Sequence, residues 1–188
     1  APDLQGVDAW IAYVEAIEEQ TLEDGVKTAF WDFEAGLVAD GLWNAIDVLV
    51  PLVGPQSLST LGASVKGVSG ALRRFETHQY DRKTGLKGGG QGGVNDGTES
   101  YINTRRRGDD YAQDDVSMAV WVSEADSQGL TFPVPYIATG GADFSSGSWI
   151  QPRGDTTDLQ IRPQSGETHL NAGSFLETGF LGFSRGSA

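Results

Sequence analysis

The chain has 188 residues, no cysteine and 26 glycines, roughly twice the usual share of glycine. Without cysteine, the fold uses neither disulfides nor thiolate chemistry. The net charge of −13 argues against nucleic-acid binding, and no apolar run approaches the ~20 residues that insertion into a membrane requires.

The charge is unevenly distributed along the chain. Residues 1–50 contain eleven acids and one lysine, a net charge of −10, which leaves a net charge of −3 for residues 51–188. Such an asymmetry indicates two regions that face different surroundings, although solubility alone also explains it.

The first 54 residues are expected to form an acidic helical segment. Apolar residues recur at steps of three and four over residues 4–20, and again from the N-cap candidate Thr21 to Leu37. Residues 42–50 continue the pattern and predict a third helix, ended by Pro51 or by Gly54-Pro55. Such short helices must bury their apolar faces against each other or against a partner.

Residues 55–79 are interpreted as a connecting segment that is partly helical. Its apolar residues fit a helical step, namely Leu61, Val65, Val68 and Leu72. Three glycines weaken that interpretation by roughly 1 kcal/mol each relative to alanine, namely Gly62, Gly67 and Gly70.

Residues 80–188 have the pattern of a β-sandwich domain, because the apolar period changes near residue 76. Short alternating runs separated by turn residues predict strands at 101–102, 116–122, 136–138, 149–150, 159–161 and 179–183. The clearest is Val116–Val122, which should place Met118 and Val122 on one face and Trp121 on the other. We therefore expect a mainly β fold, an antiparallel sandwich preceded by a helical segment.

No motif assigns a catalytic or cofactor-binding residue. Gly88–Gly93 matches G-x-G-x-x-G, but an Asn-Asp-Gly turn follows where a nucleotide site needs a helix. The two histidines, His78 and His169, belong to no local metal or catalytic pair. We predict no cofactor.

The acidic residues support neither a metal site nor glycan hydrolysis. Asp109, Asp110, Asp114 and Asp115 cluster without a calcium-loop pattern, so we expect a solvated turn and no metal. Glu124 and Asp126 lack the third acid of a lectin-like glucanase strand. Exposed aromatics could instead stack on sugars, and the candidates are Tyr80, Tyr101, Tyr111, Tyr136 and Trp149, although core positions are the simpler interpretation.

Several motifs, taken in order, resemble minor structural and tail-fibre proteins of tailed bacteriophages. The segments that carry the resemblance are Leu37–Leu49 with its Gly-Leu-Trp, Asn95–Thr104, Tyr111–Asp115, Ala119–Val122, Trp149–Arg153 and Thr178–Arg185. The resemblance implies a concanavalin- or laminin-G-like jelly roll and a place in the virion, and it brings no catalytic residues. In those proteins further strands follow the last matching segment, so the sandwich is smaller here, or the sequence is a portion, or a neighbour supplies the strands.

The resulting expectation is a non-enzymatic structural component of a phage virion, on the tail, a fibre or the capsid surface. A carbohydrate-binding adhesin that contacts a host surface glycan is the first alternative, and a glycan hydrolase is the second. The expected partners are other virion proteins and further copies of this chain, since Trp10 and Trp31 would be covered most easily by another subunit. Without the further strands, the sheet would have an open edge. The alternative to an oligomer is therefore a complete monomer whose helices fold back over that edge.

Overall fold

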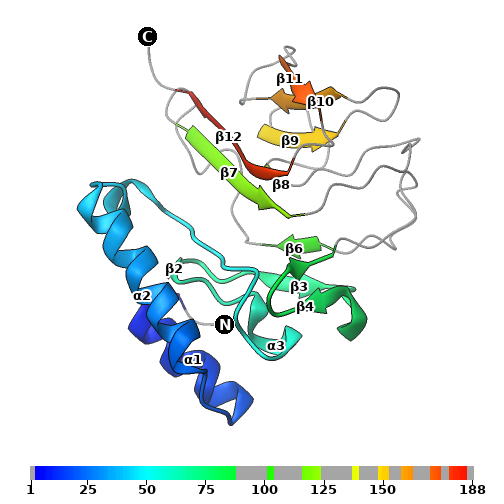
Figure 1. The fold of residues 1–188 in the computed structure, drawn as a ribbon. Helices are drawn as coiled ribbons and strands as arrows, with labels where there is room; N and C mark the ends of the chain where they lie inside the picture. Colours follow the sequence, from blue (N-terminus) through cyan, green and yellow to red (C-terminus); the bar gives the residue numbers. More distant parts are fainter. Residues whose placement is uncertain are drawn as a thin grey trace. The chain divides into compact units, whose positions relative to one another are not determined.

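The chain forms two compact units in the computed structural model (Figure 1). The first unit comprises Ala1–Gly90 and Ser100–Arg105, and the second comprises Gln91–Glu99 and Arg106–Ala188. The structure describes residues 3–87, 101–103, 116–123, 137–139, 148–152, 158–162, 170–174 and 178–185.

Two long helices begin the first unit and lie side by side (Figure 1). Helix α1 spans Val7–Glu18 and helix α2 spans Asp24–Ala39. The turn between them is short because Glu19 adopts a left-handed conformation with φ of 52°, which ends α1. Both helices confirm the prediction from the apolar period. Thr21 is not the N-cap, since α2 starts after Glu23.

The core of the first unit lies between α1 and the segment at residues 63–65. The α1 stripe predicted from the sequence is buried at Val7, Trp10, Ile11 and Val14. Ala63, Val65 and Leu22 complete the cluster. Trp10 is fully buried by its own chain, so the expectation that another subunit covers it is wrong.

The predicted third helix at residues 42–50 is wrong. Only a single 3₁₀ turn, η1 (Trp43–Ala45), forms there. The extended chain beyond it pairs with residues 65–66: the Leu49 N–H donates to the Lys66 carbonyl at 3.0 Å, and the Val65 N–H donates to the Leu49 carbonyl at 2.8 Å. The β-branched residues after Ala45, Ile46, Val48 and Val50, favour this extended conformation over a helix.

Beyond residue 57 the first unit consists of short elements. Helix α3 (Leu58–Leu61) is one turn long, and η2 (Thr77–Gln79) is a 3₁₀ turn. The strands pair antiparallel as β1 (Leu4–Gln5) with β2 (Lys66–Gly67), β3 (Ala71–Arg73) with β6 (Tyr101–Asn103), and β4 (Tyr80–Asp81) with β5 (Gly85–Leu86). The change from helix to strand therefore comes before residue 66 and not near residue 76.

A glycine explains why the connecting segment predicted at 55–79, expected to be partly helical, contains a single α-helical turn. A Cβ on Gly62 would lie 2.4 Å from the carbonyl oxygen of Gly70, and the Gly70 N–H donates to the Gly62 carbonyl at 2.7 Å. The two backbones can approach this closely only because Gly62 has no side chain. The glycines that weaken the helical pattern thus serve a backbone contact.

The second unit contains antiparallel strands. Among its described residues, β7 (Val116–Val122) pairs along its whole length with β12 (Gly179–Arg185). A four-stranded sheet has the order β11-β10-β9-β8, formed by Leu170–Ser174, Asp158–Arg162, Ser148–Pro152 and Ile137–Thr139. Five of the six predicted strand positions are strands of this unit, and the sixth, 101–102, is β6 of the first unit. Strand β11 of the second unit was not predicted.

The described elements are therefore small antiparallel sheets together with helices. On β7, Met118 and Val122 are buried while Trp121 is exposed, which confirms the predicted alternation. The division of the chain at residues 1–54, 55–79 and 80–188 and the jelly-roll arrangement stay predictions.

Glu18 joins the end of α1 to the start of α3. Its carboxylate accepts hydrogen bonds from the Gln56 N–H at 3.0 Å, from the Ser57 N–H at 2.9 Å and from the Thr60 hydroxyl at 2.5 Å. The Gln56 and Ser57 N–H groups precede the helix, so Glu18 satisfies backbone donors of the loop and the Thr60 side chain of α3. Glu18 therefore fixes the loop that precedes α3.

We predict that Glu18→Ala lowers the free energy of unfolding by about 1–2 kcal/mol, because the hydrogen bonds that fix the loop before α3 are lost. Glu18→Gln should cost less, since the amide oxygen still accepts. Urea unfolding followed by circular dichroism measures both. An alanine variant as stable as the parent chain would contradict this role of Glu18.

Candidate interaction surfaces

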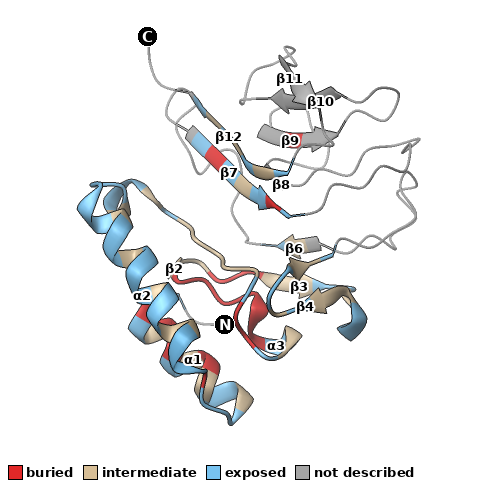
Figure 2. Cartoon of the chain, viewed as in Figure 1, coloured by how far each residue is buried: buried red, intermediate tan, exposed pale blue. Residues whose placement is uncertain are grey.

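Helix α2 is attached to α1 along one side. The rings of Trp10 and Phe30 are 4.4 Å apart between centroids, and Lys27 forms an ion pair with Glu15 at 2.7 Å. Glu34 accepts a hydrogen bond from the Val7 N–H at 3.3 Å. These contacts orient the helix but leave every residue of α2 at least partly exposed (Figure 2).

Beside its contacts with α1, helix α2 carries an exposed apolar stripe, which we call the α2 stripe. It consists of Trp31, Ala35 and Val38 with Leu42 just beyond the helix, at steps of four, three and four residues. Trp31 is 43%, Val38 56% and Leu42 50% exposed. The Trp31 indole N–H donates to Asp8 at 2.8 Å, which holds the ring in place. Trp31, Ala35 and Val38 lie on one face of the helix at a spacing typical of a helix–helix contact, and Leu42 follows beyond the turn at Gly41.

A bidentate ion pair connects the helices to the β4–β5 hairpin. The Arg82 guanidinium donates to both Glu23 oxygens, at 2.6 and 2.5 Å, and to the Gly54 carbonyl at 2.9 Å. The hydrogen bonds from Arg82 lower the pKa of Glu23 to about 2 from its usual 4.5. The pair favours the ionised carboxylate and is therefore sensitive to acid.

The paired strands β7 and β12 present two exposed aromatic rings. Trp121 and Phe180 are direct cross-strand partners, and they are 70% and 71% exposed. The next outward pairs are Ala119 with Gly182 and Ser117 with Ser184. The outward face thus has an aromatic end, a flat middle and a hydroxyl end, and we call it the aromatic strip.

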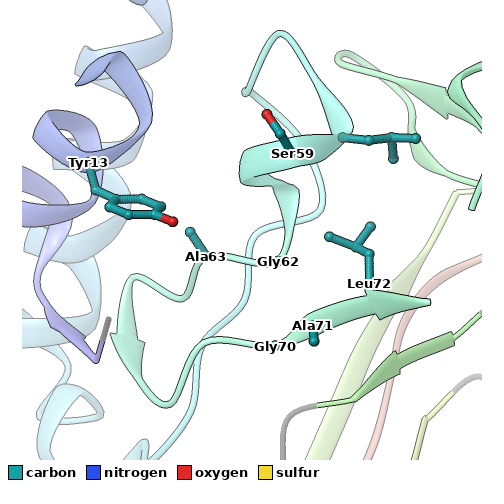
Figure 3. Close-up of a pocket in the computed structure, with 8 residues that line it drawn as sticks. Tyr13, Ser59, Gly62, Ala63, Gly70, Ala71 and Leu72 are labelled. Atoms are coloured by element: carbon teal, nitrogen blue, oxygen red, sulfur yellow. The ribbon is translucent and has the colours of Figure 1, made fainter. Parts of the chain in front are cut away.

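A pocket of about 320 Å³ lies within the first unit (Figure 3). Its lining residues are Tyr13, Leu58, Ser59, Gly62, Ala63, Gly70, Ala71 and Leu72. Tyr13 is the only lining residue with a side chain that titrates, so the lining holds no pair of groups for acid–base chemistry.

The structure places two of the candidate residues named from the sequence. His78 is exposed and lies 3.2 Å from Glu76 at the surface. Tyr80 is half-buried; its hydroxyl donates to the Pro55 carbonyl at 2.5 Å, and burial raises its pKa. Tyr80 therefore has a structural contact, as the simpler interpretation of a core position expects.

Most of the remaining candidate residues lie outside the part of the chain that the structure describes. The glycine run 88–93, the acids 109, 110, 114, 115, 124 and 126, His169, Tyr111 and Tyr136 lie outside the described residues. Tyr101 and Trp149 lie on described strands, β6 and β9. In the part of the chain that is described, no group of three or more His, Asp or Glu side chains could hold a metal ion.

The exposed aromatic pair was not among the sugar-binding candidates derived from the sequence. A signal for it exists: the alternation of β12 places Phe180 on the side of Gly182 and Ser184, opposite Leu181 and Phe183. What no pattern in the sequence gives is the register that sets Phe180 beside Trp121.

Comparison of the chain with protein-family models, with curated proteins and with solved structures finds no match. None of the described helices is both long and apolar enough to cross a membrane. Function must therefore be argued from the residues and contacts of this chain itself.

We predict that the Glu23–Arg82 pair stabilises the fold at neutral pH and ceases to do so in acid. The pKa of Glu23 is lowered in the folded chain, so its contribution is complete above about pH 4.5 and is lost as the pH falls towards about 2. Glu23→Gln should be less stable than the parent chain at neutral pH, and the difference should shrink as the pH is lowered.

Unfolding by urea at a series of pH values measures this difference. Glu19→Gln is the matched control, because Glu19 is an exposed acid of the same connection. If the free energy of unfolding of Glu23→Gln differs from that of the parent chain by the same amount from pH 7 to about pH 2.5, the ion pair is not the cause of the difference.

Proposed function

We propose that this chain is a non-enzymatic structural component of a tailed-phage virion that acts in assembly or attachment. The proposal depends on the ordered resemblance from Leu37 to Arg185, of which Ala119–Val122 and Gly179–Arg185 fall on the paired strands β7 and β12. It includes the finer fold, a concanavalin- or laminin-G-like jelly roll. The antiparallel four-stranded sheet is consistent with that arrangement.

The α2 stripe is the observation that supports an assembly role. Apolar side chains exposed at heptad-like steps on a helix without a buried residue favour contact with another helix. We propose that the contact joins copies of this chain, with other virion proteins as further partners. The proposal includes neither nucleic acid nor a membrane as a partner.

Self-association through α2 would bring like charges together. The helix contains Asp24, Asp32 and Glu34 against the single Lys27. Salt screens repulsion between exposed charges, so raising the salt concentration should strengthen this contact. A contact with a basic partner would respond in the opposite direction.

Mass spectrometry of purified particles tests the virion assignment. We expect peptides of this chain at a fixed number of copies per particle. Their absence from particles that are otherwise complete would refute the assignment, whatever the isolated chain does in solution.

We predict that Val38→Asp reduces self-association at micromolar concentration, because it places a charge in the centre of the α2 stripe. Ala29→Asp is the matched control: it adds the same charge at an exposed position on another side of the helix. Light scattering measures the mass of each variant. An unchanged oligomer in Val38→Asp, or a parent chain that is monomeric at high salt, would contradict the contact.

A further inference from the structure

We infer that the aromatic strip on β7 and β12 binds a neutral oligosaccharide, with Trp121 and Phe180 as the stacking platform. The inference rests on the proposed function only for its biological role, in which the oligosaccharide would be the ligand for attachment. Sugar binding itself is argued from the residues of the strip alone.

The exposure of the two rings requires an explanation. The inward face of the same strands is already apolar, with Met118 8% and Val122 7% exposed, so the fold does not need the outward rings. Two large aromatic side chains at about 70% exposure keep most of their apolar surface in water. Because register makes them neighbours, they form one continuous patch and not two isolated residues.

The surface beside the rings is flat because it has almost no side chains. A Cβ on Gly182 would lie 2.9 Å from the Ala119 Cβ and 3.0 Å from the Met118 carbonyl oxygen. Glycine is therefore the residue that fits opposite Ala119. A flat shelf next to an aromatic pair lets a planar or ring-shaped ligand extend along the strands.

The far end of the strip offers hydroxyl groups. The Ser117 hydroxyl donates to the Ser184 hydroxyl at 2.8 Å, and both residues are exposed. A pyranose has an apolar C–H face that packs on the electron-rich face of an aromatic ring, and a rim of hydroxyls that pair with hydroxyls. The strip presents both kinds of partner along one line.

The charge of the strip selects a neutral ligand. The three outward pairs of the strip are all uncharged, and Arg185 at the end of β12 alternates to the other face. An acidic sugar would find no cation among these pairs, and a basic peptide would find no carboxylate.

The size of the strip favours a small ligand over a second protein. Two strands of seven residues cover roughly 23 by 10 Å, or about 230 Å². A standard protein interface needs about 800 Å² from each partner. The strip is large enough for a few sugar rings and too small to hold a stable dimer by itself.

The test is calorimetric titration of the full chain with neutral hexasaccharides: β-1,4-glucan, β-1,3-glucan, α-1,4-glucan, β-1,4-mannan and chitohexaose, with a hyaluronan hexasaccharide as the anionic probe. We expect saturable binding of at least one neutral probe. Trp121→Ala and Phe180→Ala should each weaken it roughly tenfold, and the double variant should abolish it. Binding should not change between about 50 and 500 mM NaCl.

Phe33→Ala is the matched control, because Phe33 is an exposed aromatic residue of the other unit that belongs to neither surface, and this variant should bind as the parent chain does. Trp121→Phe should retain most of the affinity, which separates loss of stacking from loss of fold, and melting temperatures check each variant. Failure of every neutral probe to bind, binding that survives in the double variant, or binding of the hyaluronan probe alone would each overturn the inference. None of these outcomes touches the presence of the chain in particles, which mass spectrometry decides separately.

Discussion

The close approach of two aromatic rings to Gly54 is the constraint on which the first unit depends. A Cβ on Gly54, whose φ is 98°, would lie 2.8 Å from the Phe30 ring and 3.5 Å from the Trp10 ring. The backbone of Gly54 also exchanges hydrogen bonds with Arg82: its N–H donates to the Arg82 carbonyl at 2.9 Å, and its carbonyl accepts from the guanidinium. One residue without a side chain thus brings α1, α2 and the β4–β5 hairpin together.

This arrangement explains why α1 is buried and α2 is not. The residues at 63–65 offer one apolar surface, and α1 covers it with Val7, Trp10 and Val14. Helix α2 then contacts α1 through the Phe30 ring and the Trp31 indole N–H, while ion pairs at Glu15 and Glu23 hold its first turns. Ion pairs that remain partly exposed position a helix but stabilise it little. The apolar stripe of α2 therefore stays exposed in the folded unit and is available for the proposed assembly contact.

The sequence predicts these features to different extents. The α1 stripe and strand β7 could be predicted because a single local period decides both. The helix expected at 42–50 has a similar period, but there the backbone of Leu49 pairs with Lys66, a partner seventeen residues away. The close approach of Phe30 to Gly54, where a Cβ would lie 2.8 Å from the ring, is a contact that no periodicity reveals. The exposure of Trp121 follows from alternation, whereas its pairing with Phe180 depends on register.

The two exposed surfaces differ in the physics of what they can bind. The α2 stripe lies on an acidic helix, so charge affects every contact made there and salt changes its strength. The outward pairs of the aromatic strip are uncharged, so contact area and hydroxyl geometry decide what binds and salt has little effect. They also belong to different compact units, and a substitution on one surface leaves the local packing of the other intact. The proposed assembly and attachment roles can therefore be tested separately by single substitutions in the same chain.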